Sequence, residues 1–191
     1  IDVDYINRQL ARRQKGYGRG GRMKIEIDQV QILSGIRNGK TIGSPIALMI
    51  KNLDWENWKD VMSVESSKQS SKVTLPRPGH ADLAGVNKYD FEDIRDVIER
   101  SSARETTMRV ALSSICRKLL EDLDISLCSH VTAIQNVNSS FSFEGSRNLE
   151  DLNRDADNSP VRCLDQSAEK YMIKAIDKAR ANGDSVGGQF E

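Results

Sequence analysis

The stretch ARETTMRVALSSICRKLLEDL, residues 103–123, has the apolar period on which our interpretation of the fold rests. Its apolar side chains recur every four residues, at Ala111, Ile115, Leu119 and Leu123. This spacing predicts a long amphipathic helix that packs one stripe against a core. Ser102 stands three residues before Glu105, which is the S-x-x-E spacing of a capping box, so we expect the helix to begin at Ser102.

The residues before this helix predict one more helix and two strands. Apolar residues at helical spacing in residues 1–12 predict a short helix, with Asp2 or Asp4 as its cap. Residues 25–33, IEIDQVQIL, alternate like a strand with one slip of register at Asp28. A more continuous apolar run at residues 45–52 predicts a second strand, and Asn38-Gly39 between the two runs is a hairpin signal.

The remaining segments complete an α+β pattern. We expect helices at residues 91–99 and 167–181, the latter followed by Gly183, and a strand at residues 125–134. The order helix, strands, helices, strand, helix contains no repeated βαβ unit, so we predict largely antiparallel sheet packed on long helices. Residues 1–191 are taken as a single domain, in which the serine-rich residues 63–72 form a mobile surface loop.

Composition narrows the class of protein. The 28 basic and 28 acidic residues cancel, which argues against a surface devoted to nucleic acid. No apolar run approaches the roughly 18 residues that a membrane span needs. Three widely spaced cysteines, Cys116, Cys128 and Cys163, indicate buried thiols in a reducing compartment, and we expect a cytoplasmic protein. Only two histidines occur, fifty residues apart, and no metal site is expected.

The most unusual local feature is RRQKGYGRGGRMK, residues 12–24, with six basic residues, four glycines and no acid. Two interpretations compete for it. Arg-Gly-Gly arms bind single-stranded RNA by charge and stacking, which would make the chain an RNA-binding module. A glycine-rich loop bearing arginines also suits a small polyanion. The segment occurs once, between a helix and a strand, whereas such arms are repetitive, so we favour the polyanion.

Arginines elsewhere in the chain support an anion site. Arg77 precedes a Pro-Gly turn, and Arg104 falls in the first turn of the long helix, where a cation opposes the helix dipole unless an anion is near. Arg19 has glycines on both sides, which lets the backbone approach a ligand. For any single arginine, a solvated or salt-bridged position on the surface is the commoner role.

Other side chains have weaker claims to chemistry. His80, in the sequence PRPGHAD, lies between Arg77 and Asp82 on a loop stiffened by proline, which suits a proton donor. His130 is interpreted as structural, and Trp55 and Trp58 as packing or interface residues. The final GDSVGG segment either wraps a phosphate or allows two strands to approach closely.

Several segments, in this order and spacing, resemble the chorismate synthase family. They are RRQKGYGRGGRM, SGIRNGKTIGSPIALMIKN, RPGHADLAG, KYDFEDIRDVIERSSARETTMRVA and GDSVGG, and the resemblance covers nearly the whole chain. It implies a β-α-β sandwich, a homotetramer, and 1,4-elimination of phosphate from 5-enolpyruvylshikimate 3-phosphate to give chorismate. It also implies reduced FMN as cofactor, with NADPH as an indirect reductant in some members, and neither nucleic acid nor membrane as a partner.

The resemblance also assigns roles by motif. Arg13, Arg19, Arg77 and Arg104 match family arginines that contact substrate or flavin, and Arg22 is a weaker candidate. His80 matches a histidine that protonates or stabilises the reduced flavin, and Ser102 and Ala103 match positions beside the flavin. Family members begin with a G-E-S-H-G segment and extend far beyond the position of Glu191, so we expect this chain to be part of a longer protein.

Overall fold

The computed structural model describes residues 1–19, 27–65, 71–143, 145 and 148–191, which form an α+β fold as the sequence predicts. Its helices are α1 (Val3–Gln14), the short 3-10 helix η2 (Trp55–Asn57), α2 (Asp82–Tyr89), α3 (Ile94–Arg100), α4 (Glu105–Glu121), α5 (Leu149–Asn158) and α6 (Gln166–Ala181). Its strands are β1 (Val30–Ser34), β2 (Ile36–Arg37), β3 (Lys40–Thr41), β4 (Ala47–Ile50), β5 (Val131–Ile134), β6 (Val137–Asn138) and β7 (Gly188–Phe190). Among the described residues no helix is long and apolar enough to cross a membrane.

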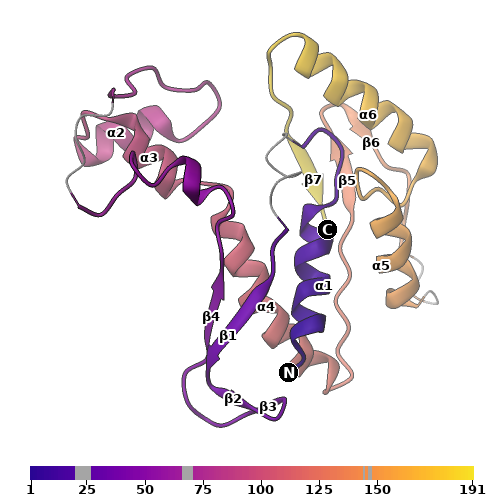
Figure 1. The fold of residues 1–191 in the computed structure, drawn as a ribbon. Coiled ribbons are helices and arrows are strands. Elements are labelled where there is room, and N and C mark those ends of the chain that lie inside the picture. The colour runs from indigo at the N-terminus through magenta and orange to yellow at the C-terminus, as the bar shows by residue number, and fades with distance from the viewer. Residues whose placement is uncertain (20–26, 66–70, 144, 146–147) are drawn as a thin grey trace.

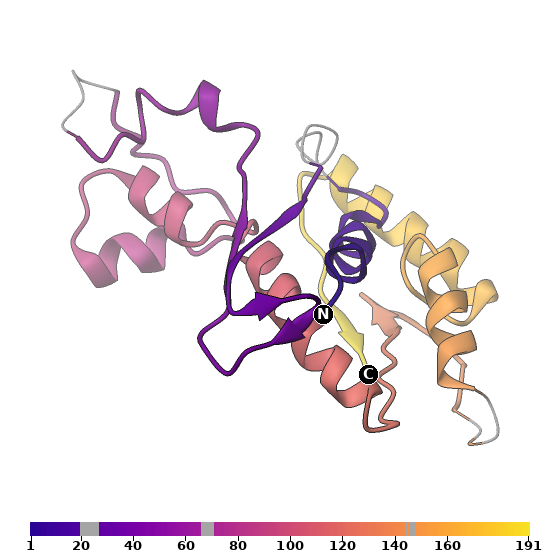
Figure 2. The ribbon, with the colours of Figure 1, turned by 60° about the horizontal axis from the view of Figure 1, so that its bottom comes forward.

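One core cluster lies where α1 packs beside α4 and the β1–β4 pair (Figures 1 and 2). Its buried members are Ile6, Leu10, Val30 and Ala111. The predicted first helix is confirmed, and the side chain of Asp2 caps it by accepting a hydrogen bond from the backbone N–H of Asp4.

The predicted strand pair and hairpin are confirmed with shorter limits. β1 and β4 pair antiparallel, and Asn38-Gly39 makes the two-residue turn between β2 and β3, with both residues at positive φ. The prediction for residues 25–33 was too long, because the strand begins at Val30, although residues 25 and 26 lie outside the described part. Ile27 is 67% exposed. The buried side chain two residues before Val30 is that of Asp28.

A second core cluster lies where α6 covers the three-stranded sheet β6-β5-β7. Met172 of α6 is fully buried there, and Gly183 at φ +66° follows the helix end as expected. A Cβ at Gly188 would lie 2.8 Å from the carbonyl oxygen of Ala133 across the strand pair. Close approach of two strands therefore explains a glycine of the GDSVGG segment.

A smaller lobe contains α2 and α3 and stands away from the rest of the molecule in Figure 1. α3 begins at Ile94 rather than at residue 91, because Asp93 caps it by accepting from the backbone N–H of Arg95. A Cβ at Gly85 in α2 would overlap Cγ1 of Val97 in α3, so the glycine lets the two helices touch. The sequence interpretation did not include α2 or α5.

The long helix departs from its prediction at both ends. It begins at Glu105, and the capping box is wrong, because the Glu105 carboxylate accepts from Arg109 while the Ser102 hydroxyl accepts from the backbone N–H of Arg104. Leu119 and Leu123 are 62% and 61% exposed, and of the expected stripe the described residues bury Ala111 fully and Ile115 partly.

Three smaller expectations concern the strand before α5, the cysteines and the serine-rich loop. The strand expected at residues 125–134 is confined to Val131–Ile134. Cys163 is buried, as predicted for all three cysteines, but Cys116 is exposed and Cys128 only partly covered. Residues 66–70 of the expected mobile loop lie outside the described part, so that expectation stays a prediction.

Candidate functional site

A buried aspartate draws together two of the arginines singled out in the sequence. The carboxylate of Asp28 is fully buried and accepts hydrogen bonds from Nη1 of Arg13 at 3.4 Å and Nη1 of Arg104 at 3.0 Å. Nε2 of Gln14 lies 3.3 Å from the same carboxylate. The partners come from α1, the segment before β1 and the N-terminal end of α4, so the fold makes this cluster from three distant parts of the chain.

Further hydrogen bonds fix the two arginines. Arg13 donates from Nη2 to the carbonyl oxygen of Ala103 at 2.9 Å and from Nε to Oγ1 of Thr106 at 3.0 Å. Arg104 donates from Nη2 to the carbonyl oxygen of Lys51 at 2.7 Å. The structure therefore brings Arg13, Arg104, Ala103 and the adjoining Ser102 into one place, which we call the Asp28 cluster.

Asp28 is the residue that the sequence interpretation missed. It was treated there only as a slip in the strand register. The available signal was its position two residues before buried Val30, since side chains two apart along an extended segment share a face. A carboxylate on a buried face needs a cationic partner, so this position could have been paired with the nearby arginines.

Arg19 lies next to Arg13 and has a different environment. Its guanidinium folds over Gly16, where a Cβ would come within 3.0 Å of Nε. Burial, and then the positive charge of Arg13, lower the pKa of Arg19 from its ordinary value. Within the described residues no carboxylate pairs with Arg19, so its charge lacks the counter-ion that Asp28 gives Arg13.

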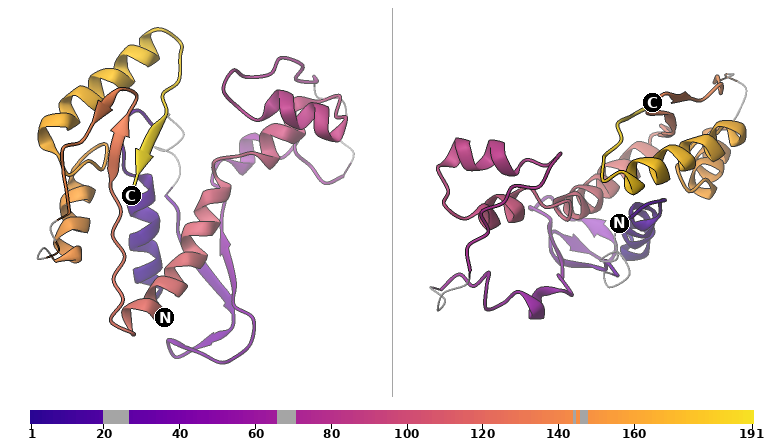
Figure 3. Two further views of the ribbon diagram at one scale, coloured as in Figure 1. Left: turned by 180° about the vertical axis from the view of Figure 1, so that it is seen from behind. Right: turned by 90° about the horizontal axis from the view of Figure 1, so that it is seen from above.

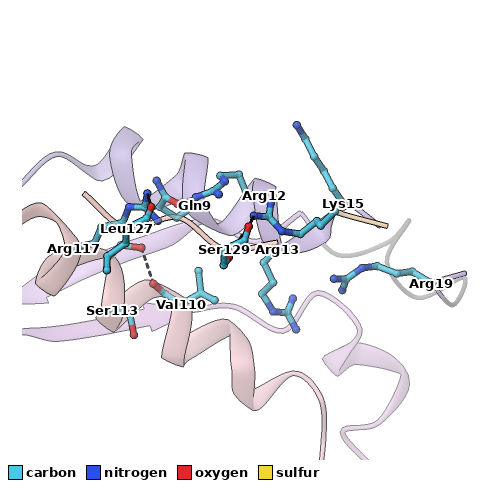
Figure 4. Close-up of a pocket in the computed structure, with 12 residues that line it drawn as sticks. Gln9, Arg12, Arg13, Lys15, Arg19, Val110, Ser113, Arg117, Leu127 and Ser129 are labelled. Atoms are coloured by element: carbon cyan, nitrogen blue, oxygen red, sulfur yellow. Dashed lines mark hydrogen bonds between the residues drawn. The ribbon is translucent and has the colours of Figure 1, made fainter. Parts of the chain in front are cut away.

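A cavity of about 370 Å³ opens between α1, α4 and the segment before β5 (Figure 4). Its basic lining residues are Arg12, Arg13, Lys15, Arg19, Arg117 and Arg162. Four of them have acidic partners, since Arg13 pairs with Asp28, Arg12 and Arg162 share Asp157, and Arg117 pairs with Glu121. Burial opposes ionisation of Asp157, but its hydrogen bonds and ion pairs with the two arginines hold its pKa below the usual value.

The described part of the glycine-rich segment lies on the folded body. The backbone N–H of Tyr17 donates to the carbonyl oxygen of Pro160 at 2.7 Å, and its hydroxyl donates to Asp177 at 2.8 Å. The hydrogen bond to Asp177 raises the pKa of Tyr17. These contacts hold residues 16–18 against the part of the chain around α5 and α6. Arg22 lies outside the described residues.

The loop before α2 holds Arg77 and His80 by local bonds. The backbone N–H and Nε of Arg77 each donate to Oδ2 of Asp82 at 2.9 Å, and Nη2 donates to Oδ1 at 3.0 Å. The side-chain hydrogen bond from Arg77 is the largest cause that lowers the pKa of the Asp82 carboxyl to about 2. Arg77 therefore fixes the conformation of the loop through Asp82, and it needs no ligand to do so.

His80 is exposed, and its Nδ1 lies 2.9 Å from the carbonyl oxygen of Pro78. A carbonyl can only accept, so Nδ1 carries a proton and Nε2 is the atom left for a partner. Within the described part of the chain, no hydrogen bond or ion pair joins Arg77 or His80 to the Asp28 cluster. The loop instead lies near the connection from α6 to β7, because a Cβ at Gly79 would lie 3.6 Å from Oγ of Ser185. Figure 3 shows from behind how the lobe of α2 and α3 stands on one side of α4 and α6 on the other.

Comparison with known proteins gives a consistent result. A family model described as "Chorismate synthase" matches residues 1–191. The chorismate synthase of Alkaliphilus metalliredigens (strain QYMF) is 54% identical over 192 residues, and that of Geobacillus sp. (strain WCH70) is 51% identical over 193 residues. These matches cover 100% and 99% of this chain but 50% and 49% of the relatives.

A solved structure shows the same likeness. The structure titled "Crystal Structure of Chorismate Synthase" superimposes with a TM-score of 0.73 at 33% identity, over 100% of this chain and 48% of that one. The chain thus spans about half the length of the proteins it matches.

Proposed function

The chain belongs to the chorismate synthase family, and from this premise we propose that it forms an anion-binding part of a lyase that makes chorismate. The substrate would be 5-enolpyruvylshikimate 3-phosphate, from which phosphate and a ring proton are eliminated. Homotetramer formation, a cytoplasmic location and NADPH as indirect reductant follow from the same family and belong to the same proposal.

The observation that carries the proposal is the gathering of the three guanidiniums of Arg13, Arg19 and Arg104 around one described carboxylate, that of Asp28. Two of these guanidiniums share the single carboxylate of Asp28, and Arg19 has no carboxylate partner in the described part. The substrate carries one phosphate and two carboxylates, which guanidiniums bind through two parallel hydrogen bonds. Arg19 would make the direct contact, because no carboxylate among the described residues competes for it.

Asp28 gives the other two arginines their orientation before any ligand arrives. Held by Asp28 and by the carbonyl oxygens of Ala103 and Lys51, Arg13 and Arg104 cannot turn away into solvent. Charges that are fixed in advance stabilise an anion without a further cost of reorganisation. The two arginines would then act mainly through their fixed positive charge.

His80, Ser102, Ala103 and Arg104 would hold the flavin. The donor set fits an anionic ring, because Nε2 of His80 has no partner among the described residues, and Ala103 adds little bulk beside Arg104. Reduced FMN, when bound, supplies electron density transiently to the substrate. His80 would donate a proton from Nε2 in its charged form, while the Pro78 carbonyl keeps the ring oriented.

The test compares Arg19→Ala with Arg109→Ala in the complete native protein. Arg109 is exposed, and its partner among the described residues is Glu105 one turn away, so it is a matched control. We expect Arg19→Ala to raise KM for 5-enolpyruvylshikimate 3-phosphate at least about tenfold, the typical loss for a charged hydrogen bond. Arg109→Ala should leave KM unchanged.

Equal KM values in the two variants would contradict the proposal. Salt-sensitive binding of oligonucleotides without binding of this substrate would support the alternative of an RNA-binding module.

A further inference from the structure

We infer that the cavity between η2 and α3 binds a small aromatic carboxylate. This cavity has a volume of about 400 Å³ and shares no lining residue with the arginine-lined cavity beside α1. Nothing in the proposed chemistry uses it, so the inference stands apart from the proposed function.

The walls of the cavity are aromatic and apolar. Both tryptophans of the chain, Trp55 and Trp58, line it and remain 42% and 39% exposed. The indole N–H of Trp58 donates to Oδ2 of Asp54 at 2.8 Å, which fixes that ring at the cavity wall. Met62 and Ile98 add apolar surface beside the rings. A flat ring entering here would remove exposed indole surface from water and gain offset stacking.

One nitrogen of the Arg95 guanidinium lacks an acceptor among the described residues. Nε of Arg95 is buried and has no hydrogen-bond partner in the described part of the chain. The guanidinium carbon lies 5.8 Å from the centroid of the Trp58 ring, so the group stands at the aromatic wall. No ion pair with a described carboxylate neutralises it. The cavity wall carries the positive charge of Arg95, and a ligand carboxylate in the cavity would supply a counter-charge and accept hydrogen bonds from the guanidinium.

Two acidic residues, Asp93 and Glu99, lie within four positions of Arg95 in the sequence. Glu99 lines the cavity one helical turn away, but it is exposed and forms no ion pair with Arg95. Asp93 forms its hydrogen bonds with the backbone N–H groups of Val73 and Arg95, where it caps α3, and the charge of Arg95 contributes only as one of the later causes that lower its pKa against burial. Arg95 therefore remains the group that selects an anion, and Glu99 at the wall weakens the attraction.

The tryptophans also report on the site. Because the chain contains only these two, its indole fluorescence comes from the cavity itself. The probe is 3-phenylpropionate, added to the complete native protein with excitation at the red edge of indole absorption, where a phenyl ring does not absorb. Tryptophans elsewhere in a longer protein are removed from the signal by subtracting the titration of a Trp55→Phe/Trp58→Phe variant.

We expect a saturable fluorescence change with 3-phenylpropionate and binding at least about tenfold weaker in Arg95→Met, which keeps the length and apolar surface of the side chain but not its charge. Glu99→Gln should bind the probe more tightly. The neutral analogue 3-phenylpropan-1-ol should bind the unaltered protein more weakly than the acid, a comparison that does not depend on any variant folding.

Three results would overturn the inference: no saturable change in the unaltered protein, equal binding of the alcohol and the acid, or full affinity in a folded Arg95→Met protein. Weaker binding in Glu99→Gln would contradict the placement of the carboxylate at Arg95.

Discussion

The Asp28 cluster and the loop before α2 both hold an arginine on a buried aspartate, but over very different lengths of chain. Asp28 binds Arg104, 76 residues away, whereas Asp82 binds Arg77, five residues away. The first pairing exists only when α1, β1 and α4 have packed together, and the second can form within one segment. The same aspartate–arginine pairing therefore joins distant elements in the Asp28 cluster and fixes the conformation of one loop at Asp82.

The largest effect should come from removing the carboxylate at the centre of the long-range cluster. Asp28→Ala would remove the carboxylate that the largely buried Arg13 and Arg104 share, and we expect it to lower the free energy of unfolding by about 3 kcal/mol. Urea denaturation followed by circular dichroism measures this. The control is Glu105→Ala, whose exposed ion pair with Arg109 should contribute less than about 1 kcal/mol. A similar loss in both variants would show that the Asp28 carboxylate contributes no more to stability than an exposed ion pair.

Arg104→Ala should cost less, because Asp28 keeps its bonds to Arg13 and Gln14. We expect a loss of about 2 kcal/mol, the range for a hydrogen bond to a charged group. If the arginine also binds substrate, KM should rise in addition. Thermal melting and steady-state kinetics on the same preparation separate the two effects. A variant as stable as the unaltered protein would show that Arg104 does not hold the cluster.

The short-range pair of Asp82 and Arg77 should lose its contribution to stability over a narrow range of acidic pH. The pKa of Asp82 is lowered to about 2 in the folded protein, so its contribution to stability is complete above the ordinary carboxyl pKa near 4 and is lost as the pH falls towards 2. The amide resonance of Arg77, whose N–H binds Asp82, should shift with that midpoint. Asp82→Asn should remove the titration and lower global stability less than Asp28→Ala does. A midpoint near 4 would contradict the pairing.

The smallest effect on stability is expected at His80. Its ring is exposed and bonds only to its own loop, so His80→Gln should change the free energy of unfolding by less than about 0.5 kcal/mol. Turnover should fall about a hundredfold if the ring donates a proton, while substrate affinity is kept. Pre-steady-state binding and turnover with reduced flavin measure the two quantities. Unchanged turnover would remove His80 from the proposed chemistry.

The same contrast explains what could be predicted from the sequence. The Asp2 cap, the Asn38-Gly39 turn and Gly183 after α6 were foreseen because each depends on neighbouring residues. The pairing of Asp28 with Arg104 was not, since it depends on how β1 meets α4. The exposed Leu119 shows the same limit, because periodicity predicts an apolar helix face without saying what covers it.

The grouping of arginines was predicted only in part. Arg13 and Arg104 lie together, while Arg77 was expected beside them and is instead held by its own loop. Sequence gives the residue types that favour an anion, but the folded chain decides which of them already have a protein partner.

The glycine at position 85 has a mechanical consequence for the loop that carries His80. α2 begins at Asp82, directly after the loop that carries His80. The helix packs against Val97 of α3 at Gly85. A single methyl group added at Gly85 would push α2 away from Val97. The helix would tilt, and the imidazole of His80 would move with it. The orientation of His80 thus depends on the contact between Gly85 and Val97, which lies away from the loop that would meet a ligand.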